Sequence, residues 1–139
     1  MKLSKLTTIV IVTINGKVYH NVIKRLYKFY KIIIVENNND ILFKKKISLK
    51  FKNVEVLLPK KNLGFGGGNN FATKKVKTPY VLYLGPDVDL SLRSVRKLES
   101  QIKIIPNFTI IAPNSNHFIE TVNTDLDKVC KKRFIEIDR

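Results

Sequence analysis

A glycine-rich segment and a pair of acidic residues are the parts of this chain best suited to chemistry. Residues 61–70 read Lys-Asn-Leu-Gly-Phe-Gly-Gly-Gly-Asn-Asn, and Pro86-Asp87-Val88-Asp89 follows the apolar run 80–84. Glycines let a backbone approach a ligand closely, and the amide groups at a helix start attract negative charge. Carboxylates bind hard divalent cations. Together the two segments predict a site for a nucleoside diphosphate and a cation.

Two other phosphate-binding motifs do not fit the same glycines. A dinucleotide fingerprint would need glycine where the chain has Asn69, and it follows the first strand of its fold, whereas this segment follows the third expected strand. A P-loop would need Gly-Lys-Ser or Gly-Lys-Thr at its end, which is absent here. A flexible surface loop is the plain alternative, but Asn69, Asn70 and an expected helix follow directly and disfavour it.

Strand-like and helix-like segments alternate along the chain. Residues 7–13 form an uninterrupted, β-branched apolar run, which is typical of a central strand covered on both faces. Strands are expected at 7–13, 31–35, 54–58, 80–84 and 108–112, with shorter ones at 118–122 and 134–137, and helices at 17–30, 41–52, 69–77 and 91–105. This alternation predicts an α/β fold with a mostly parallel central sheet and helices on both faces.

Polar and glycine-rich residues follow four of these strands. They occupy positions 13–15, 36–40, 60–68 and 85–89. In parallel sheets the ligand lies beyond the carboxyl ends of the strands, where connections diverge to opposite faces. We therefore expect these four clusters to share one rim of the sheet.

The chain is strongly basic. Its 139 residues include 26 Lys and Arg against 11 Asp and Glu, which gives a net charge of +15, and 44% of the residues are hydrophobic, as in a folded domain. Such charge favours polyanionic partners. The lysines are scattered, however, and an AT-rich genome would give the same bias without a function. Nucleic acid is disfavoured because no basic patch interleaved with aromatic residues is present.

The chain offers few signals for its compartment. Cys130 is the only cysteine, so no internal disulfide forms, which is compatible with a reducing cytoplasm. The apolar run 6–14 is too short to span a bilayer and is predicted to be a strand. We expect a cytoplasmic protein, with peripheral contact at the inner face of the membrane as a compatible side role. No clear basic amphipathic helix supports that contact.

Four segments in order resemble the motifs of family-2 glycosyltransferases of the GT-A fold, and more narrowly of their rhamnosyltransferase-like branch. The segments are Ile9–Asn15, Ile34–Asn38, Asn62–Asn70 and Leu84–Val88. The resemblance implies a Rossmann-like, nucleotide-sugar-binding domain at 1–112. Residues 113–139 would be the incomplete start of the acceptor-side region.

The resemblance also implies roles for residues in these segments. Thr13 and Asn15 would contact the base or ribose, and Glu36 would accept a hydrogen bond from the pyrimidine N3–H, which selects uracil or thymine over cytosine. Aspartate is the usual family residue at position 36, and an exposed loop acid is the plain alternative. The remaining donor-binding positions would be Asn38, Asn62, Gly64, Gly68 and Asn69.

Metal binding is expected at the acidic pair. Asp87 takes the place of the last carboxylate of the family's Asp-x-Asp motif, which holds Mg²⁺ or Mn²⁺ against the diphosphate, while Gly85 stands at the first position. Asp89 would share a face with Asp87 if the strand continued. If the chain turns there, Asp89 would only cap the next helix.

The implied activity is inverting transfer of a sugar from a UDP- or dTDP-sugar to a saccharide or lipid-linked acceptor, in cell-wall or polysaccharide biosynthesis. Such a transfer needs a general base. Glu120, Asp125 and Asp127 lie in no recognisable motif, so the catalytic base is unknown. Family members are longer, so a truncated reading frame, a fragment and an inactive donor-binding remnant all remain open. The alternative function is a non-catalytic module that binds a nucleotide sugar or a polyanion.

Overall fold

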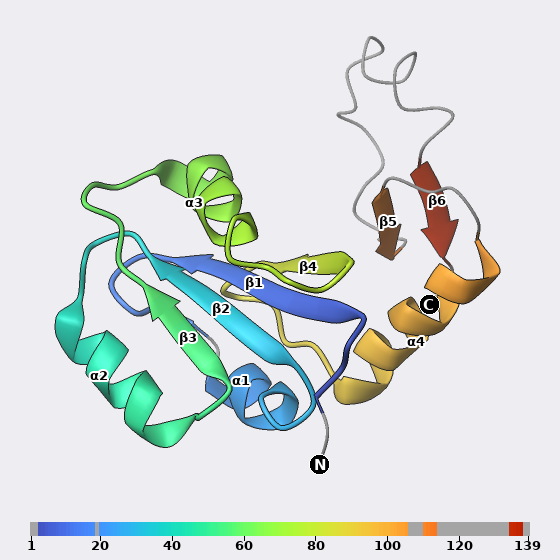
Figure 1. Ribbon diagram of the computed structural model, residues 1–139, viewed down its shortest axis with the longest axis horizontal. Coiled ribbons are helices and arrows are strands. Elements are labelled where there is room, and N and C mark those ends of the chain that lie inside the picture. The colour runs from blue at the N-terminus through green and yellow to red at the C-terminus, as the bar shows by residue number, and fades with distance from the viewer. Residues whose placement is uncertain (1–2, 19, 106–109, 114–133, 138–139) are drawn as a thin grey trace, which may run out of the picture. The chain divides into compact units, whose positions relative to one another are not determined.

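The computed structural model describes residues 3–18, 20–105, 110–113 and 134–137 (Figure 1). The chain divides into two compact units, Met1–Leu92 and Arg93–Arg139. The expected short strand at 118–122 lies outside the described residues. No helix in the described ranges has both the length and the apolar character needed to cross a membrane.

The first unit is built on a parallel sheet of four strands. These are β1 (Thr7–Thr13), β2 (Lys31–Glu36), β3 (Val54–Leu57) and β4 (Tyr80–Leu84), in the order β3-β2-β1-β4. Both central strands consist largely of buried β-branched residues, as expected for strands covered on both faces. The predicted parallel α/β architecture is confirmed for this unit.

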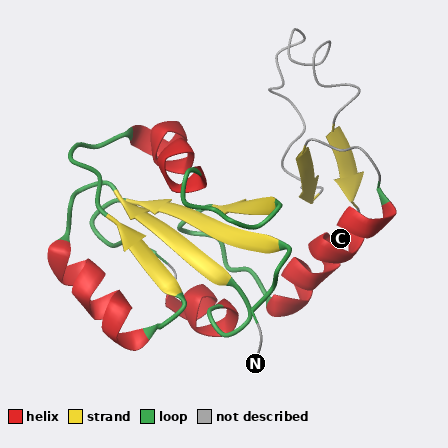
Figure 2. Ribbon diagram, viewed as in Figure 1, coloured by secondary structure: helices red, strands yellow, loops and turns green. Residues whose placement is uncertain are grey.

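Helices cover both faces of this sheet. The helices α1 (His20–Leu26) and α2 (Ile41–Lys50) pack on one face, and α3 (Gly64–Thr73) packs on the other (Figure 2). The chain steps outward from β1 through β2 to β3 and then returns across the sheet through α3 to β4. The direction of winding therefore reverses between β1 and β4.

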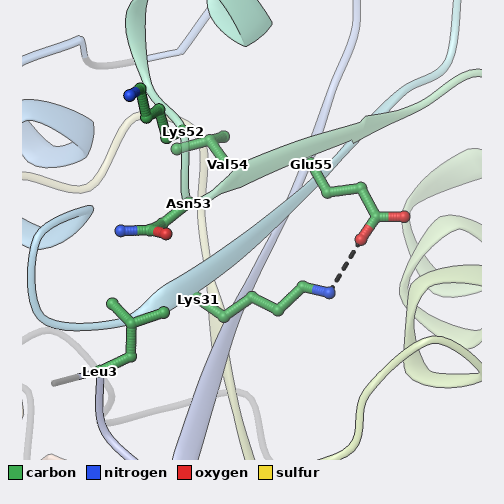
Figure 3. Close-up of a pocket in the computed structure, with 6 residues that line it drawn as sticks. All are labelled: Leu3, Lys31, Lys52, Asn53, Val54 and Glu55. Atoms are coloured by element: carbon green, nitrogen blue, oxygen red, sulfur yellow. Dashed lines mark ion pairs between the residues drawn. The ribbon is translucent and has the colours of Figure 1, made fainter.

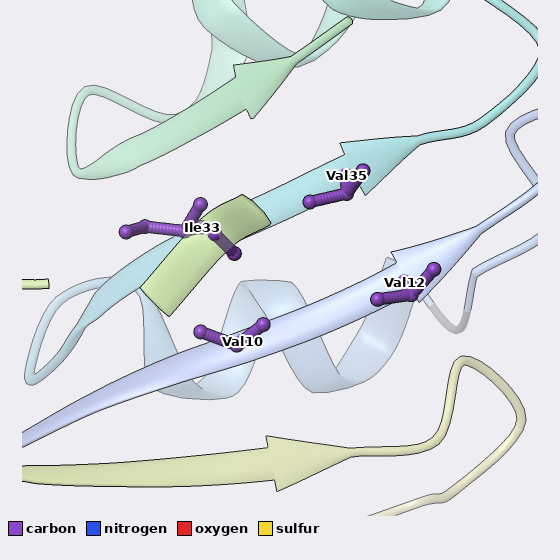
Figure 4. Close-up of a cluster of buried hydrophobic side chains, with 5 residues drawn as sticks. Val10, Val12, Ile33 and Val35 are labelled. Carbon is purple, nitrogen blue, oxygen red and sulfur yellow. The ribbon is translucent and has the colours of Figure 1, made fainter. Parts of the chain in front are cut away.

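The core has two layers because successive strand residues point to opposite faces. Val10, Val12, Ile33 and Val35 line the face that α3 covers, where they pack with Ala72 (Figure 4). The other face buries residues from α1, α2 and the alternate strand positions. Those fully or almost fully buried include Ile9, Ile11, Val22, Ile23, Leu26, Ile32, Ile34 and Ile47.

The second unit contains one helix and two strands among its described residues. Its helix, α4 (Leu92–Ile104), begins at the last residue of the first unit. β5 (Ile110–Pro113) and β6 (Phe134–Ile137) pair in parallel as a separate two-stranded sheet. The boundary expected at residue 112 falls within β5 and remains a prediction of the family resemblance.

One predicted helix boundary is clearly wrong. We expected the third helix to begin at Asn69, but α3 begins at Gly64 and ends at Thr73. Glycine disfavours a helix by about 1 kcal/mol relative to alanine, so residues 64–68 read as a loop. Burial of Gly68 and Ala72 against the sheet overrides that preference. The first helix is also shorter than expected, since α1 covers only His20–Leu26 of 17–30.

Candidate functional site

The strand registers bring the expected polar clusters to one edge of the sheet. Thr13 pairs with Glu36, and Val35 pairs with Leu57, so β1, β2 and β3 end together. β4 ends at Leu84, which pairs with Ile11, two residues before the end of β1. This edge also contains the point between β1 and β4 where the winding reverses, which is where doubly wound sheets bind ligands.

Glu36 is fully buried at the end of β2. Its Oε2 accepts hydrogen bonds from the backbone amides of Asn38, at 3.1 Å, and Asp40, at 2.7 Å. Asp40 in turn caps α2 by accepting from the amide of Phe43 at 2.8 Å. Glu36 therefore shapes the loop between β2 and α2. Its Oε1 is buried and has no hydrogen-bond partner among the described residues.

Asn37 connects this loop to the glycine-rich segment, and the sequence did not single it out. Its Nδ2 donates to the carbonyl of Gly64 at 3.1 Å, and its Oδ1 accepts from the amide of Leu63 at 3.2 Å. Its own amide donates to the carbonyl of Thr13 at 2.9 Å. Asn37 thus ties the end of β1, the end of β2 and the start of α3 together. The sequence feature that could have pointed to Asn37 is the polar run directly after a buried strand, but this run does not distinguish Asn37 from Asn38.

The loops after β1 and β2 also meet through their side chains. Asn38 Nδ2 donates to Asn15 Oδ1 at 2.6 Å, and both residues are exposed. Asn15 has a φ of 55°, which the short polar side chain of asparagine tolerates. The Thr13 hydroxyl points elsewhere and donates to the carbonyl of Lys17 at 2.6 Å. Asn15 and Asn38 are therefore the more accessible of the expected base-contacting residues.

The glycine-rich segment has an open part and a packed part. Gly64 has a φ of +67°, and its amide donates to Asn62 Oδ1 at 2.8 Å. A Cβ added at Gly68 would lie 2.8 Å from Val12 Cγ1, so this glycine is what lets α3 lie close against β1. Nothing lies within 4 Å of a Cβ built at Gly64 or Gly66. Space for a ligand is therefore at the start of α3 rather than at Gly68.

The first turn of α3 offers backbone donors. The first four amides of any α-helix have no acceptor within the helix. Here Asn37 and Asn62 accept from the amides of Leu63 and Gly64, and α3 has no side-chain cap at its N-cap residue. The next two amides, at 65 and 66, are left for solvent or an anion. Asn69 lies one turn farther along and is partly buried.

The two acidic residues after β4 differ in surroundings. The amide of Val88 donates to the carbonyl of Gly85 at 3.2 Å, so the chain turns directly after β4. Asp87 is exposed, and its Oδ1 would be 2.9 Å from a Cβ at Gly85, so the carboxylate folds back over this glycine. Asp89 forms an ion pair with Arg25, which lies in α1. The strand therefore does not continue through Asp89, and the two carboxylates do not share a strand face.

Among the described residues at this edge, Asp87 is an exposed carboxylate that is neither paired with a cation, as Asp89 is, nor used as a helix cap, as Asp40 is. Among the described residues, no three His, Cys, Asp or Glu side chains gather as a metal-binding group. Mg²⁺ is commonly held by one or two carboxylates together with phosphate oxygens and water. Asp87 alone fits that mode, with a diphosphate supplying further oxygens.

A surface hollow lies at the opposite edge of the sheet. Leu3, Lys31, Lys52, Asn53, Val54 and Glu55 line it at the amino ends of β2 and β3 (Figure 3). Lys31 Nζ lies 2.9 Å from Glu55 Oε2 across it. This hollow shares no residue with the candidate site.

The structure thus joins most of the expected site residues. Hydrogen bonds connect the loops that carry Asn15, Glu36, Asn38, Asn62 and Gly64, while the register of β4 places Asp87 at the same edge. Residues 8–127 match the family model described as Glycosyl transferase family 2. None of the curated proteins matches the chain.

Proposed function

Because the chain belongs to glycosyl transferase family 2, we propose that its first unit binds a UDP- or dTDP-sugar at the carboxyl edge of the sheet. The sugar would pass to a saccharide or lipid-linked acceptor. The observation that carries the proposal is the pair of hydrogen bonds at the start of α3, in which the Asn37 side chain donates to Gly64 and accepts from Leu63. It holds the loop suited to a base next to the helix start suited to phosphate.

The base would lie against the loops after β1 and β2. Asn15 and Asn38 offer exposed amide groups, and Glu36 Oε1 offers a carboxylate acceptor without a competing donor. A carboxylate accepts from the N3–H of uracil or thymine, while neutral cytosine has no such proton. Since Glu36 is fully buried, the loop at 37–40 would have to shift before a base reaches this oxygen.

The diphosphate would lie at the first turn of α3. The backbone amides at 65 and 66 lie at the positive end of the α3 helix dipole, which stabilises anions. The absence of side chains at Gly64 and Gly66 allows phosphate oxygens to approach the backbone. The nearby lysines at 60 and 61 are exposed and add positive charge.

Asp87 would hold Mg²⁺ or Mn²⁺ in this complex. A cation bound there would stabilise the charge that develops on the departing diphosphate. Asp89 would have to leave Arg25 to become a second ligand, so the proposal uses Asp87 alone. The candidate acids for a general base, Glu120, Asp125 and Asp127, lie outside the described residues, and no base is assigned.

Isothermal titration calorimetry tests this function. We expect UDP or dTDP to bind the chain with Mn²⁺ present, and Asp87→Asn to weaken that binding by about tenfold or more, as the loss of a charged ligand contact implies. Glu55→Gln is the matched control, because Glu55 is a half-exposed acid at the opposite edge. Absence of binding to the wild-type chain would contradict the proposal.

A further inference from the structure

The helix α2 exposes large apolar side chains to solvent. Ile41 is 55% exposed, Leu42 is 76% exposed and Leu49 is 88% exposed. The inward side of the same helix is also apolar, with Phe43 and Ile47 buried against the sheet. A surface helix normally presents polar residues on its outer side. The outer side of α2 therefore carries apolar area that the fold does not use.

Positive charge surrounds these apolar side chains. Lys44, Lys45, Lys46 and Lys50 belong to α2, which contains no acidic residue. They are exposed, and they take no part in the ion pairs that Arg25 forms with Asp89 and Lys31 forms with Glu55. We define the α2 surface as the outer side of this helix. Its apolar and basic members are Ile41, Leu42, Lys44, Lys45, Lys46, Leu49 and Lys50.

The neighbouring helix α1 extends the positive field. Burial and then the charges of Lys46, Lys50 and Lys24 lower the pKa of His20, which begins α1. The positive charges of lysines from both helices therefore repel a proton on the same side chain, that of His20. With its pKa lowered, His20 is mostly uncharged at neutral pH, so the positive charge near α1 and α2 comes from the lysines.

We propose that the α2 surface docks on an anionic lipid bilayer, with Leu42 and Leu49 entering the headgroup region and the lysines contacting lipid phosphates. Helices that lie in a membrane interface combine exposed apolar side chains with basic ones in this way. Anionic headgroups complement the charge of the surface, and each lysine near such a membrane strengthens binding by about fivefold. The proposal does not depend on nucleotide binding.

The apolar residues favour lipid over nucleic acid as the partner. Proteins that bind single strands stack bases on aromatic side chains, and those that bind a duplex contact phosphates with polar or basic groups. The exposed apolar residues of α2 are aliphatic, and a phosphate backbone would leave them in water. A bilayer interface removes them from water while it pairs the lysines.

Vesicle sedimentation with the 139-residue chain, without nucleotide, tests whether the lysines of α2 contribute to membrane binding. We expect binding to vesicles of phosphatidylcholine mixed with phosphatidylglycerol and little binding to phosphatidylcholine alone. The triple variant Lys44→Gln, Lys45→Gln, Lys46→Gln should bind about a hundredfold more weakly. The control is Lys74→Gln, Lys75→Gln, Lys77→Gln, which removes the same charge from exposed positions that follow α3. Equal losses in the two triple variants would overturn the proposal.

A second pair of variants tests the apolar contact. Leu49→Ser should weaken vesicle binding by about tenfold, because an inserted leucine side chain is removed from water. The control is Ile104→Ser, since Ile104 is also exposed, at 68%, but lies outside α2. Both changes are at exposed positions, so circular dichroism should show an unchanged fold. The lipid proposal is wrong if Leu49→Ser binds the vesicles as tightly as the wild-type chain does. It is also wrong if duplex DNA binds the chain as tightly as the anionic vesicles do and Leu49→Ser does not change the affinity for DNA.

Discussion

The side chain of Asn37 donates a hydrogen bond to the backbone carbonyl of Gly64 across 3.1 Å. These residues are far apart in the sequence, one after β2 and the other at the start of α3. The contact fixes where the open glycines lie relative to the loop that Glu36 shapes. The geometry of the candidate site therefore depends on a residue that is 7% exposed.

Replacing Asn37 by alanine should destabilise the first unit. The change leaves the amide of Leu63 and the carbonyl of Gly64 without their partners, which costs about 1–3 kcal/mol for partly buried groups. Urea denaturation measures this loss as a lower midpoint. Asn38→Ala is the control, because its bond to Asn15 is exposed and should contribute little. Equal stability of the two variants would contradict the role assigned to Asn37.

Gly68→Ala should also destabilise the unit, whereas Gly66→Ala should not. The new methyl group at position 68 would meet Val12 at 2.8 Å, and overpacking of this kind costs about 1–3 kcal/mol. A methyl group at position 66 meets nothing within 4 Å, so alanine should stabilise the helix by about 0.5–1 kcal/mol. Thermal unfolding of the two variants measures both effects. The packing explanation fails if Gly68→Ala unfolds no earlier than wild type, or if Gly68→Ala lowers stability as much in a Val12→Ala background as it does in the wild-type chain.

Glu36→Gln should change base preference more than fold. The glutamine carbonyl oxygen can still accept from the amides of Asn38 and Asp40, so the loop should keep its shape. The other position would now carry an amide donor, which cannot accept the N3–H of uracil. We expect the affinity ratio of UDP to CDP to fall by about tenfold in calorimetry, as the loss of one charged hydrogen bond implies. An unchanged ratio would show that Glu36 serves only the loop.

Asp89→Asn should leave nucleotide binding nearly unchanged. Asp89 pairs with Arg25, and both side chains are substantially exposed, at 57% and 42%. Exposed ion pairs contribute about 0–1 kcal/mol, so unfolding should also change little. Calorimetry with UDP and Mn²⁺ compares this variant with Asp87→Asn. A loss at Asp89 equal to that at Asp87 would mean that both carboxylates hold the cation.

The sequence predicts the sheet better than the helix starts. The β-branched runs of β1 and β2 are buried on both faces, and no other element type suits them. The start of α3 is different, because Asn37 bonds to Leu63 and Gly64 there and Gly68 packs closely on Val12, and these contacts join distant segments. A local propensity cannot represent such a contact.

In the candidate site, too, the sequence predicts the arrangement of the strands better than the details that depend on contacts between distant residues. The order of the motifs predicts which loops gather at the edge, since parallel strands end together. The individual roles depend on side-chain direction, which places Asn37 inward and Asn38 outward. The α2 surface was missed for a related reason. Apolar residues on both sides of α2 cancel the periodic signal of an amphipathic helix.

The most direct test of the proposed site is paramagnetic broadening of backbone amide resonances by Mn²⁺ in the presence of UDP. We predict that the signals of Asn38, Gly66 and Asp87 broaden first, since the cation and diphosphate would lie at the carboxyl edge of the sheet. Signals of Asn53 and Glu55, at the opposite edge, should remain sharp. Broadening centred on Asn53 and Glu55, or broadening that UDP does not affect, would contradict the account.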